Sequence, residues 1–198
     1  MLLFFVVGVS VRLRPLASIF GEREYWQDMY EGRGDFPSDE YSWYLGWREL
    51  APIWEEMSPG RSVVVPGAGN DPCVAELHDA GYEVTAFDYA PAAIERLREL
   101  LGDRSVRLEV ADARSLPDMG PFDAALDKGF ADAVHLGGAL KEAVDQLHRV
   151  LRPGASYLCV TTVVPPDLLD SAFSTTKWRK HRDGAADIGP GLYIFTRT

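Results

Sequence analysis

The fold is decided by the stretch Val63-Val64-Val65-Pro66-Gly67-Ala68-Gly69-Asn70-Asp71-Pro72. Its first three residues are β-branched and apolar, which predicts a short buried strand. Two glycines follow at once, and their missing side chains allow a turn of backbone to come close to a ligand. Pro72 suits the first turn of a helix and Asp71 suits its N-cap. The stretch therefore predicts a strand, a bare turn beneath a ligand, and a helix.

The same alternation of strand and helix continues beyond this stretch. Helices are predicted to begin near Pro72, Pro91 and Ala131, and the last of them is expected to end at Pro153-Gly154. That last helix carries an apolar face at three- or four-residue spacing, formed by Ala139, Ala143, Leu147 and Val150. Short apolar segments predict five strands, at residues 63–65, 84–87, 106–110, 124–126 and 157–161. Such alternation is typical of βαβ units and a parallel sheet.

The C-terminal segment follows a different pattern. After Pro165-Pro166 and a short helical piece come two stretches, Trp178–His181 and Leu192–Phe195, with a turn predicted at Asp183-Gly184. They predict two antiparallel strands. We therefore expect an α/β, Rossmann-like, seven-stranded and mostly parallel sheet with an antiparallel C-terminal hairpin and helices on both faces. This plan resembles that of class I methyltransferases, whereas a nucleotide-binding Rossmann domain more often continues with a sixth parallel strand.

Composition narrows the class of protein. The chain has 198 residues, of which 46% are hydrophobic, and this suits one α/β domain. A formal charge of −10 argues against nucleic acid as a partner. Cys73 and Cys159 stand far apart without a CxxC or Cys/His cluster, so we expect neither a metal site nor a disulfide. This cysteine usage favours a reducing compartment, and we expect a cytoplasmic protein.

Two acidic residues follow successive predicted strands beside the glycine turn. Asp88 ends the second strand, roughly twenty residues beyond the glycines, where a carboxylate can accept both hydroxyl groups of a ribose. Asp112 follows the third strand and can accept from the amino group of an adenine. Either residue could instead cap a helix, but the two together favour an adenosine cofactor. A dinucleotide is disfavoured because Pro72 stands where the GxGxxG pattern has its third glycine.

The end of the fourth predicted strand carries a further charged pair, Asp127-Lys128. Ligands of open parallel sheets lie over the carboxyl ends of the strands, so both side chains are expected to point toward the reacting group. The alternative is that the two simply pair with each other in the interior. We take Asp127 as the candidate catalytic residue, which could orient the group receiving the transfer.

Several segments together resemble one family. They are Tyr25-Trp26-Gln27-Asp28-Met29-Tyr30, Tyr41-Ser42-Trp43-Tyr44, Val65-Pro66-Gly67-Ala68-Gly69-Asn70, Phe87-Asp88-Tyr89 and Leu126-Asp127-Lys128-Gly129. They resemble the methyltransferase-like lysine methyltransferases that modify translation elongation factor 1-alpha. The resemblance runs from about Glu22 to the C-terminus. It departs after Lys128-Gly129, where the family has Thr-Leu-Asp and this chain has Phe130-Ala131-Asp132.

The resemblance implies S-adenosylmethionine as cofactor and a lysine amine of a protein, such as a translation factor, as acceptor. It implies that the N-terminal helices carry cofactor contacts. With the glycine turn and the acids, the expected cofactor-binding residues are Trp26, Tyr30, Trp43, Gly67, Ala68, Gly69, Asp88, Tyr89, Asp112, Ala113 and Lys128. Tyr30, Trp43 and Phe130 are candidates to line a narrow channel that lowers the pKa of an entering amine.

The N-terminal part is expected to contain two units. The apolar run Met1–Val9 is too short to cross a bilayer, so residues 1–21 are expected to be an extension, although a signal anchor or targeting peptide stays open. Residues 22–198 are expected to form the methyltransferase domain. Within it, residues 22–58 are expected to form two helices, broken near Gly32–Gly34 and Pro37, that cover the cofactor.

Other functions remain open at this point. The stretch from Val65 to Asp88 also resembles the thiopurine methyltransferase type, which would make the acceptor a small molecule. A non-catalytic cofactor-binding module is a third interpretation. An NAD-dependent reductase is disfavoured, because the third glycine and a Tyr-x-x-x-Lys pair are missing. The acceptor atom, the number of methyl groups and the oligomeric state stay open.

Overall fold

The computed structural model describes residues 16–182 and 190–198. The run Met1–Val9 and the turn expected at Asp183-Gly184 lie outside these residues. Within the described part of the chain, no helix is long and apolar enough to cross a membrane.

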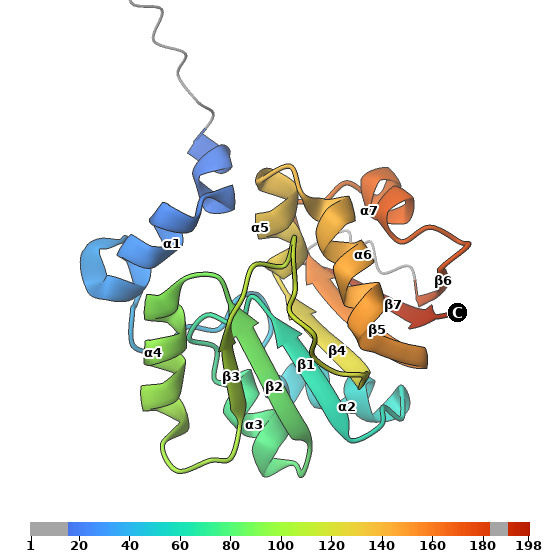
Figure 1. The fold of residues 1–198 in the computed structure, drawn as a ribbon, viewed down its shortest axis with the longest axis horizontal. Coiled ribbons are helices and arrows are strands. Elements are labelled where there is room, and N and C mark those ends of the chain that lie inside the picture. The colour runs from blue at the N-terminus through green and yellow to red at the C-terminus, as the bar shows by residue number, and fades with distance from the viewer. Residues whose placement is uncertain (1–15, 183–189) are drawn as a thin grey trace, which may run out of the picture.

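A seven-stranded sheet forms the centre of the molecule (Figure 1). Its order is β3-β2-β1-β4-β5-β7-β6, with β7 antiparallel to both neighbours and the other pairings parallel. The strands are β1 Ser62–Pro66, β2 Glu83–Asp88, β3 Arg107–Val110, β4 Phe122–Lys128, β5 Leu151–Thr161, β6 Trp178–Arg182 and β7 Gly191–Arg197. The fold expected from the sequence is confirmed, including the antiparallel hairpin in place of a sixth parallel strand.

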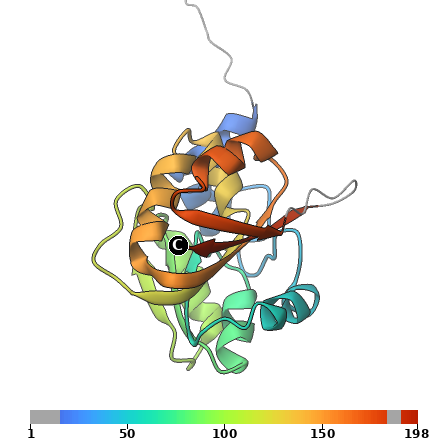
Figure 2. The same cartoon turned by 90° about the vertical axis from the view of Figure 1, so that its right-hand side faces the viewer.

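Helices cover both faces of the sheet (Figures 1 and 2). One core lies under α2 Trp47–Glu56, α3 Cys73–Asp79 and α4 Pro91–Leu101, and the other under α5 Phe130–Leu136, α6 Leu140–Val150 and α7 Pro166–Ala172. Successive side chains of a strand point to opposite faces. On β1, Val63 and Val65 therefore enter the first core and Val64 enters the second.

The single helix expected from Ala131 to Pro153-Gly154 is wrong. Two helices stand there, α5 and α6, and they are separated by Gly137-Gly138. Gly138 has a φ of +72°, which a helix cannot contain. The second helix ends at Val150, and β5 begins at the next residue, several positions before the predicted strand. Proline and glycine are tolerated there because the pairing of β4 with β5 has a bulge in this region.

The N-terminal segment lies beside the carboxyl ends of the central strands. It comprises a 3₁₀ turn Leu16–Gly21, α1 Arg23–Asp28, a π turn Met29–Arg33 and an irregular stretch that ends where α2 begins. The expected break near Gly32–Gly34 is confirmed. The expected second helix starts only at Trp47, so Tyr41–Tyr44 are not helical. The side chains of Ser42 and Tyr44 bind the ends of two central strands: Ser42 contacts Asp71 after β1 and Lys128 at the end of β4, and Tyr44 contacts Asp132 after β4.

Candidate active site

A cavity of about 720 Å³ lies between the N-terminal segment and the carboxyl ends of β1, β2 and β4. This is where open parallel sheets bind their ligands, and the volume falls within the range of small-molecule sites. Of the residues expected to bind the cofactor, all eleven line this cavity: Trp26, Tyr30, Trp43, Gly67, Ala68, Gly69, Asp88, Tyr89, Asp112, Ala113 and Lys128. The fold thus brings together positions that lie up to about a hundred residues apart in the chain.

The turn after β1 has the conformation that its glycines predict. Gly67 and Gly69 both have a φ of +55°, in the left-handed region that favours glycine. A Cβ at Gly67 would lie 2.7 Å from the Phe130 ring, and a Cβ at Gly69 would meet the Tyr30 hydroxyl. Because these two glycines have no side chains, the rings of Phe130 and Tyr30 can lie directly against the turn. Both rings also form part of the cavity wall.

Asp88 is held at the end of β2 with its carboxylate in the cavity wall. One oxygen accepts the N–H of Gly69 at 3.1 Å and the other accepts the N–H of Ala90 at 2.9 Å. Burial raises the pKa of this carboxyl to about 6, although the backbone N–H groups oppose that change. Each oxygen keeps a further lone pair, so the geometry suits two hydroxyl donors such as those of a ribose.

Asp112 stands at the cavity rim and already has a partner. Its carboxylate pairs with the Arg114 guanidinium, with an Nη2 to Oδ2 distance of 2.5 Å, and this contact lowers the pKa of Asp112. The side chain is about one third exposed. Asp112 therefore lines the cavity as expected, and it also forms an ion pair with Arg114 that was not expected from the sequence.

Aromatic side chains from the N-terminal segment close the cavity. Trp26 stacks on Tyr30 with ring centroids 6.1 Å apart and meets Trp43 edge-on at the same distance. The Trp26 indole N–H donates to the carbonyl of Phe20 at 2.7 Å. Because Tyr30 is buried and its hydroxyl faces acidic residues, its pKa lies well above the ordinary value. These rings can exclude water from a bound ligand.

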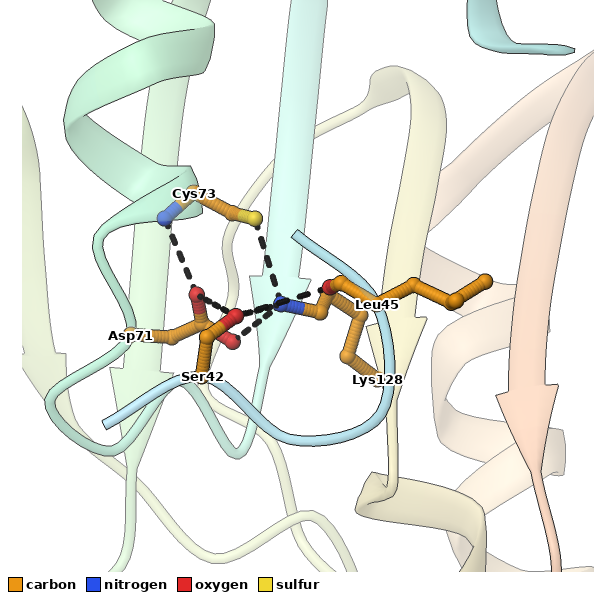
Figure 3. Close-up of polar contacts among 5 residues, drawn as sticks. All are labelled: Ser42, Leu45, Asp71, Cys73 and Lys128. Carbon is orange, nitrogen blue, oxygen red and sulfur yellow. Dashed lines mark hydrogen bonds and ion pairs between the residues drawn. The ribbon is translucent and has the colours of Figure 1, made fainter. Parts of the chain in front are cut away.

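Lys128 belongs to a buried polar network (Figure 3). Its ammonium donates to Asp71 Oδ2 at 2.6 Å, to Ser42 Oγ at 2.7 Å and to Cys73 Sγ at 3.1 Å. Asp71 also accepts the N–H of Cys73, the first residue of α3, at 2.9 Å, whereas the N-cap position expected for Asp71 is occupied by Pro72. Lys128 therefore ties the N-terminal segment to the glycine turn, and its partner is Asp71 rather than Asp127.

Asp127 does not reach the cavity wall. Adjacent residues of a strand face opposite sides, so Asp127 and Lys128 cannot point the same way, which corrects the expectation for this pair. The Asp127 carboxylate is fully buried and accepts the Tyr157 hydroxyl at 2.8 Å and the N–H of Ala131 at 3.2 Å. Burial raises its pKa to about 7. Its contacts lie in the core, beneath α5.

One hydrogen-bonded pair in the cavity wall, Tyr44 and Asp132, was not among the site residues expected from the sequence. The Tyr44 hydroxyl donates to Asp132 Oδ2 at 2.5 Å across 88 positions of the chain. Both residues line the cavity, and Asp132 is only 4% exposed. Asp132 stands one helical turn after Lys128-Gly129, and an acid in that position was a signal available in the sequence.

The wall residues fit an adenosyl cofactor. At one side Asp88 keeps free lone pairs over the glycine turn, and the rim carries Asp112 and the half-buried Tyr89. Toward β4 and β5 the wall changes to Trp43, Tyr44 and Asp132. The cavity wall therefore differs in chemistry between the side that carries Asp88 and the side that carries Tyr44 and Asp132.

Comparisons with known proteins agree with this assignment. A family model described as "Methyltransferase domain" matches residues 64–159. An "eEF1A lysine and N-terminal methyltransferase" of Xenopus laevis is 31% identical over 153 residues, which make up 72% of this chain and 22% of that protein. A demethylmenaquinone methyltransferase of Clavibacter sepedonicus is 31% identical over 122 residues, which make up 60% of this chain and 46% of that protein. The chain thus spans about a fifth of the length of the first relative.

Solved structures share the whole architecture. One, described as "Conversion of a Disulfide Bond into a Thioacetal Group during Echinomycin Biosynthesis", has a TM-score of 0.72 and 21% identity, over 88% of this chain and 92% of that chain. Others of this fold hold S-adenosylmethionine. The chain has the fold of class I S-adenosylmethionine-dependent methyltransferases, and its residues 64–159 match the methyltransferase-domain family. Its relatives in sequence include proteins named for methylating the lysine and the N-terminus of eEF1A.

Proposed function

We propose that this methyltransferase transfers the methyl group to a protein amine, a lysine side chain as in the name of its relatives. The observation that carries the proposal is the asymmetry of the cavity. The glycine turn and Asp88 lie above β1 and β2, whereas Trp43, Tyr44 and Asp132 form the opposite end above β4 and β5. We call the latter three residues the acceptor end. An aromatic and acidic end suits a cationic or amine-bearing group.

The cofactor, when bound, supplies a methyl group on a sulfonium sulfur. The chain has to hold the acceptor nitrogen in line with that methyl group and keep water out, and such positioning supplies much of the rate enhancement. The nitrogen lone pair forms the new C–N bond while the C–S bond breaks and leaves its electron pair on sulfur. The product ammonium then releases its proton to solvent, so the chemistry requires no protein base.

The N-terminal segment serves this function by enclosing the reacting groups. We propose that residues 22–58 cover the cofactor, as the resemblance implies. Trp26, Tyr30 and Trp43 shield the cavity from water, and Ser42 anchors the segment to Lys128. Desolvation by these rings disfavours the charged form of an entering lysine, which lowers its pKa and exposes the lone pair.

We propose a basic surface of a translation factor as the docking partner. The support is the similarity to proteins named for eEF1A and the formal charge of −10, which attracts a basic surface. The reaction is proposed to occur in the cytoplasm, where Cys73 and Cys159 remain free thiols.

A transfer assay tests the proposal directly. The full chain is incubated with S-adenosylmethionine labelled on the methyl group and a eukaryotic cell extract, with Asp88→Ala as the control. Label in protein that survives acid hydrolysis as methylated lysine is the expected result. Label confined to small molecules would overturn the protein acceptor, and no transfer despite measurable cofactor binding would support a non-catalytic module.

A small-molecule acceptor is the second candidate. It is favoured by the similarity to demethylmenaquinone methyltransferase, which covers 60% of this chain, and by a cavity enclosed on its N-terminal side. The same assay separates the two candidates, because organic extraction would remove a labelled metabolite and leave labelled protein behind.

A further inference from the structure

Tyr44 has a backbone conformation that side-chain-bearing residues rarely adopt. Its φ is +65°, in the left-handed region, and it lies in the wall of the cavity. Two features hold it there. Its hydroxyl binds Asp132, and its ring rests on Gly129, where a Cβ would lie 3.2 Å from Tyr44 Cε2. Strained residues that are held by several contacts cluster at functional sites.

Asp132 orients this tyrosine and is itself fully engaged. Its carboxylate accepts the N–H groups of Thr162, Val163 and Val164 at 2.9 to 3.1 Å and the hydroxyls of Thr161 and Tyr44. With five donors on two oxygens, the carboxylate has no room for a substrate group. Asp132 is therefore a positioning residue that fixes the Tyr44 hydroxyl relative to the end of β5.

The Tyr44 oxygen, in contrast, keeps one lone pair. It donates its proton to Asp132 and accepts from Thr162 Oγ1 at 2.9 Å. A phenol oxygen has two lone pairs, so one remains. Donation to a carboxylate increases the negative charge on the oxygen and makes it a better acceptor. Burial and the Asp132 carboxylate raise the pKa of Tyr44, so the phenol cannot act as a base.

We propose that Tyr44 Oη is the acceptor-binding atom of the cavity and takes an N–H of a primary amine, with Trp43 beside it. This inference rests on the proposed function and assigns its specificity. A neutral amine needs no base, because its lone pair can attack while an N–H is held. A hydroxyl acceptor has to lose a proton, and neither Tyr44 nor the saturated Asp132 takes one. A carboxylate acceptor has no proton to donate and is repelled by Asp132.

The test uses n-butylamine as a lysine side-chain probe and methyl propyl ether, which has the same number of heavy atoms and no hydrogen-bond donor, as its neutral counterpart. Binding to the full chain saturated with S-adenosylhomocysteine is followed by ligand-observed NMR. We expect Tyr44→Phe to weaken n-butylamine binding about three- to tenfold, the range of one hydrogen bond, with binding of methyl propyl ether unaffected because an ether has no proton to donate. The matched control is Tyr25→Phe, which also removes a hydroxyl bound to a carboxylate, at Asp35, but outside the cavity wall.

Two further measurements distinguish loss of the Tyr44 hydrogen bond from loss of the folded site. Tyr44→Phe must retain the affinity for S-adenosylhomocysteine, because a general collapse of the site would lower it. If Tyr44→Phe unfolds, Thr162→Val tests the same Tyr44 oxygen. This variant removes the hydroxyl that donates to Tyr44 Oη and so frees a lone pair of that oxygen. We then expect about two- to fivefold tighter n-butylamine binding. Equal amine binding by wild type and Tyr44→Phe, or no amine binding at all, would overturn the assignment.

Failure of this inference can be told apart from failure of the proposed function. Labelled methyl groups on oxygen or sulfur would support methyltransferase activity but contradict the assignment of Tyr44 as an amine-binding residue. Amine binding that depends on Tyr44, without any labelled protein, would support the amine subsite and contradict the proposed protein acceptor.

Discussion

Single residues of the same type have different roles in this cavity because their environments differ. Asp88 is buried with only backbone donors, so its pKa rises, whereas Asp112 pairs with Arg114 and its pKa falls. Asp127 is buried in the core, with a pKa near 7 and no contact with the cavity. Residue type alone therefore does not identify a functional acid, and the donors around each carboxylate do.

Loss of the Asp88 carboxylate should weaken cofactor binding. Asp88→Ala removes the carboxylate that we propose as the acceptor for two ribose hydroxyl groups, and we expect binding of S-adenosylmethionine to weaken by about 1 to 3 kcal/mol. Isothermal titration calorimetry measures the change. Asp118→Ala, at a fully exposed position, is the control and should leave the affinity unchanged. Equal affinities for wild type and Asp88→Ala would remove Asp88 from the site.

Cofactor affinity should depend on pH through the same carboxyl. The folded-state pKa of Asp88 is about 6, raised from an ordinary value of 3.8, so the group is protonated in the folded protein at pH 5 and ionised at pH 7. Between these pKa values the folded state holds the proton more tightly, so this group's contribution to stability falls as pH rises. Because the ionised form is the better acceptor, we expect about tenfold weaker binding at pH 5 than at pH 7. Titrations of Asp88→Asn should be flat over this range, and an identical slope in both proteins would contradict the assignment.

At this site, aromatic rings of the N-terminal segment pack against the turns that follow two of the central strands. The β1–α3 turn carries the two left-handed glycines, and the β4–α5 turn carries Gly129 beneath Tyr44. Only glycine allows an aromatic ring to lie directly against such a turn. The turns thus determine how closely the N-terminal segment can approach the sheet.

Gly129→Ala should separate backbone strain from the contact with Tyr44. Gly129 has a φ of +80° and Gly138 a φ of +72°, so alanine is strained by about 1 to 2 kcal/mol at either position. Only the Cβ at Gly129 meets Tyr44, whereas nothing lies within 4 Å at Gly138. We expect urea denaturation to show a larger loss of stability for Gly129→Ala than for Gly138→Ala, and only the former to weaken n-butylamine binding. Equal losses with unchanged amine binding would show that the Tyr44 contact has no effect.

On the scale of the whole molecule, the cavity exists because the N-terminal segment is bound to the sheet at several points. Ser42 contacts Lys128 and Asp71, Tyr44 contacts Asp132, and Arg96 of α4 donates to the carbonyl of Tyr30 at 3.0 Å. These contacts join parts of the chain that are far apart in sequence. The stability of the fold and the integrity of the site are therefore coupled.

Lys128→Met should destabilise the whole molecule. It leaves the Asp71 carboxylate buried without its cation, which costs about 3 to 5 kcal/mol for a buried pair. The control is Lys141→Met, which removes the exposed pair with Asp145 and should cost less than about 1 kcal/mol. Urea denaturation gives both values, and limited proteolysis should show earlier cleavage of the N-terminal segment in Lys128→Met. A loss no larger than that of the control would mean that the Asp71 ion pair adds little to stability.

Local patterns in the sequence determined the strands, the glycine turn and the positions of Asp88 and Asp112. Each depends on residues that are close in the chain, and parallel strands bring their carboxyl ends to one edge whatever the rest of the fold does. The break between α5 and α6 also had a local signal in Gly137-Gly138, although the apolar spacing across these two glycines favoured one continuous helix.

Only the tertiary structure decided the partners of side chains that face each other from distant segments. Lys128 pairs with Asp71 across 57 positions, and Tyr44 binds Asp132 across 88. Sequence spacing carries no information about such pairs, because their distance depends on how the N-terminal segment packs on the sheet. The physical reason is that strand periodicity determines which face a residue occupies, while the partner it meets there depends on every element packed against that face.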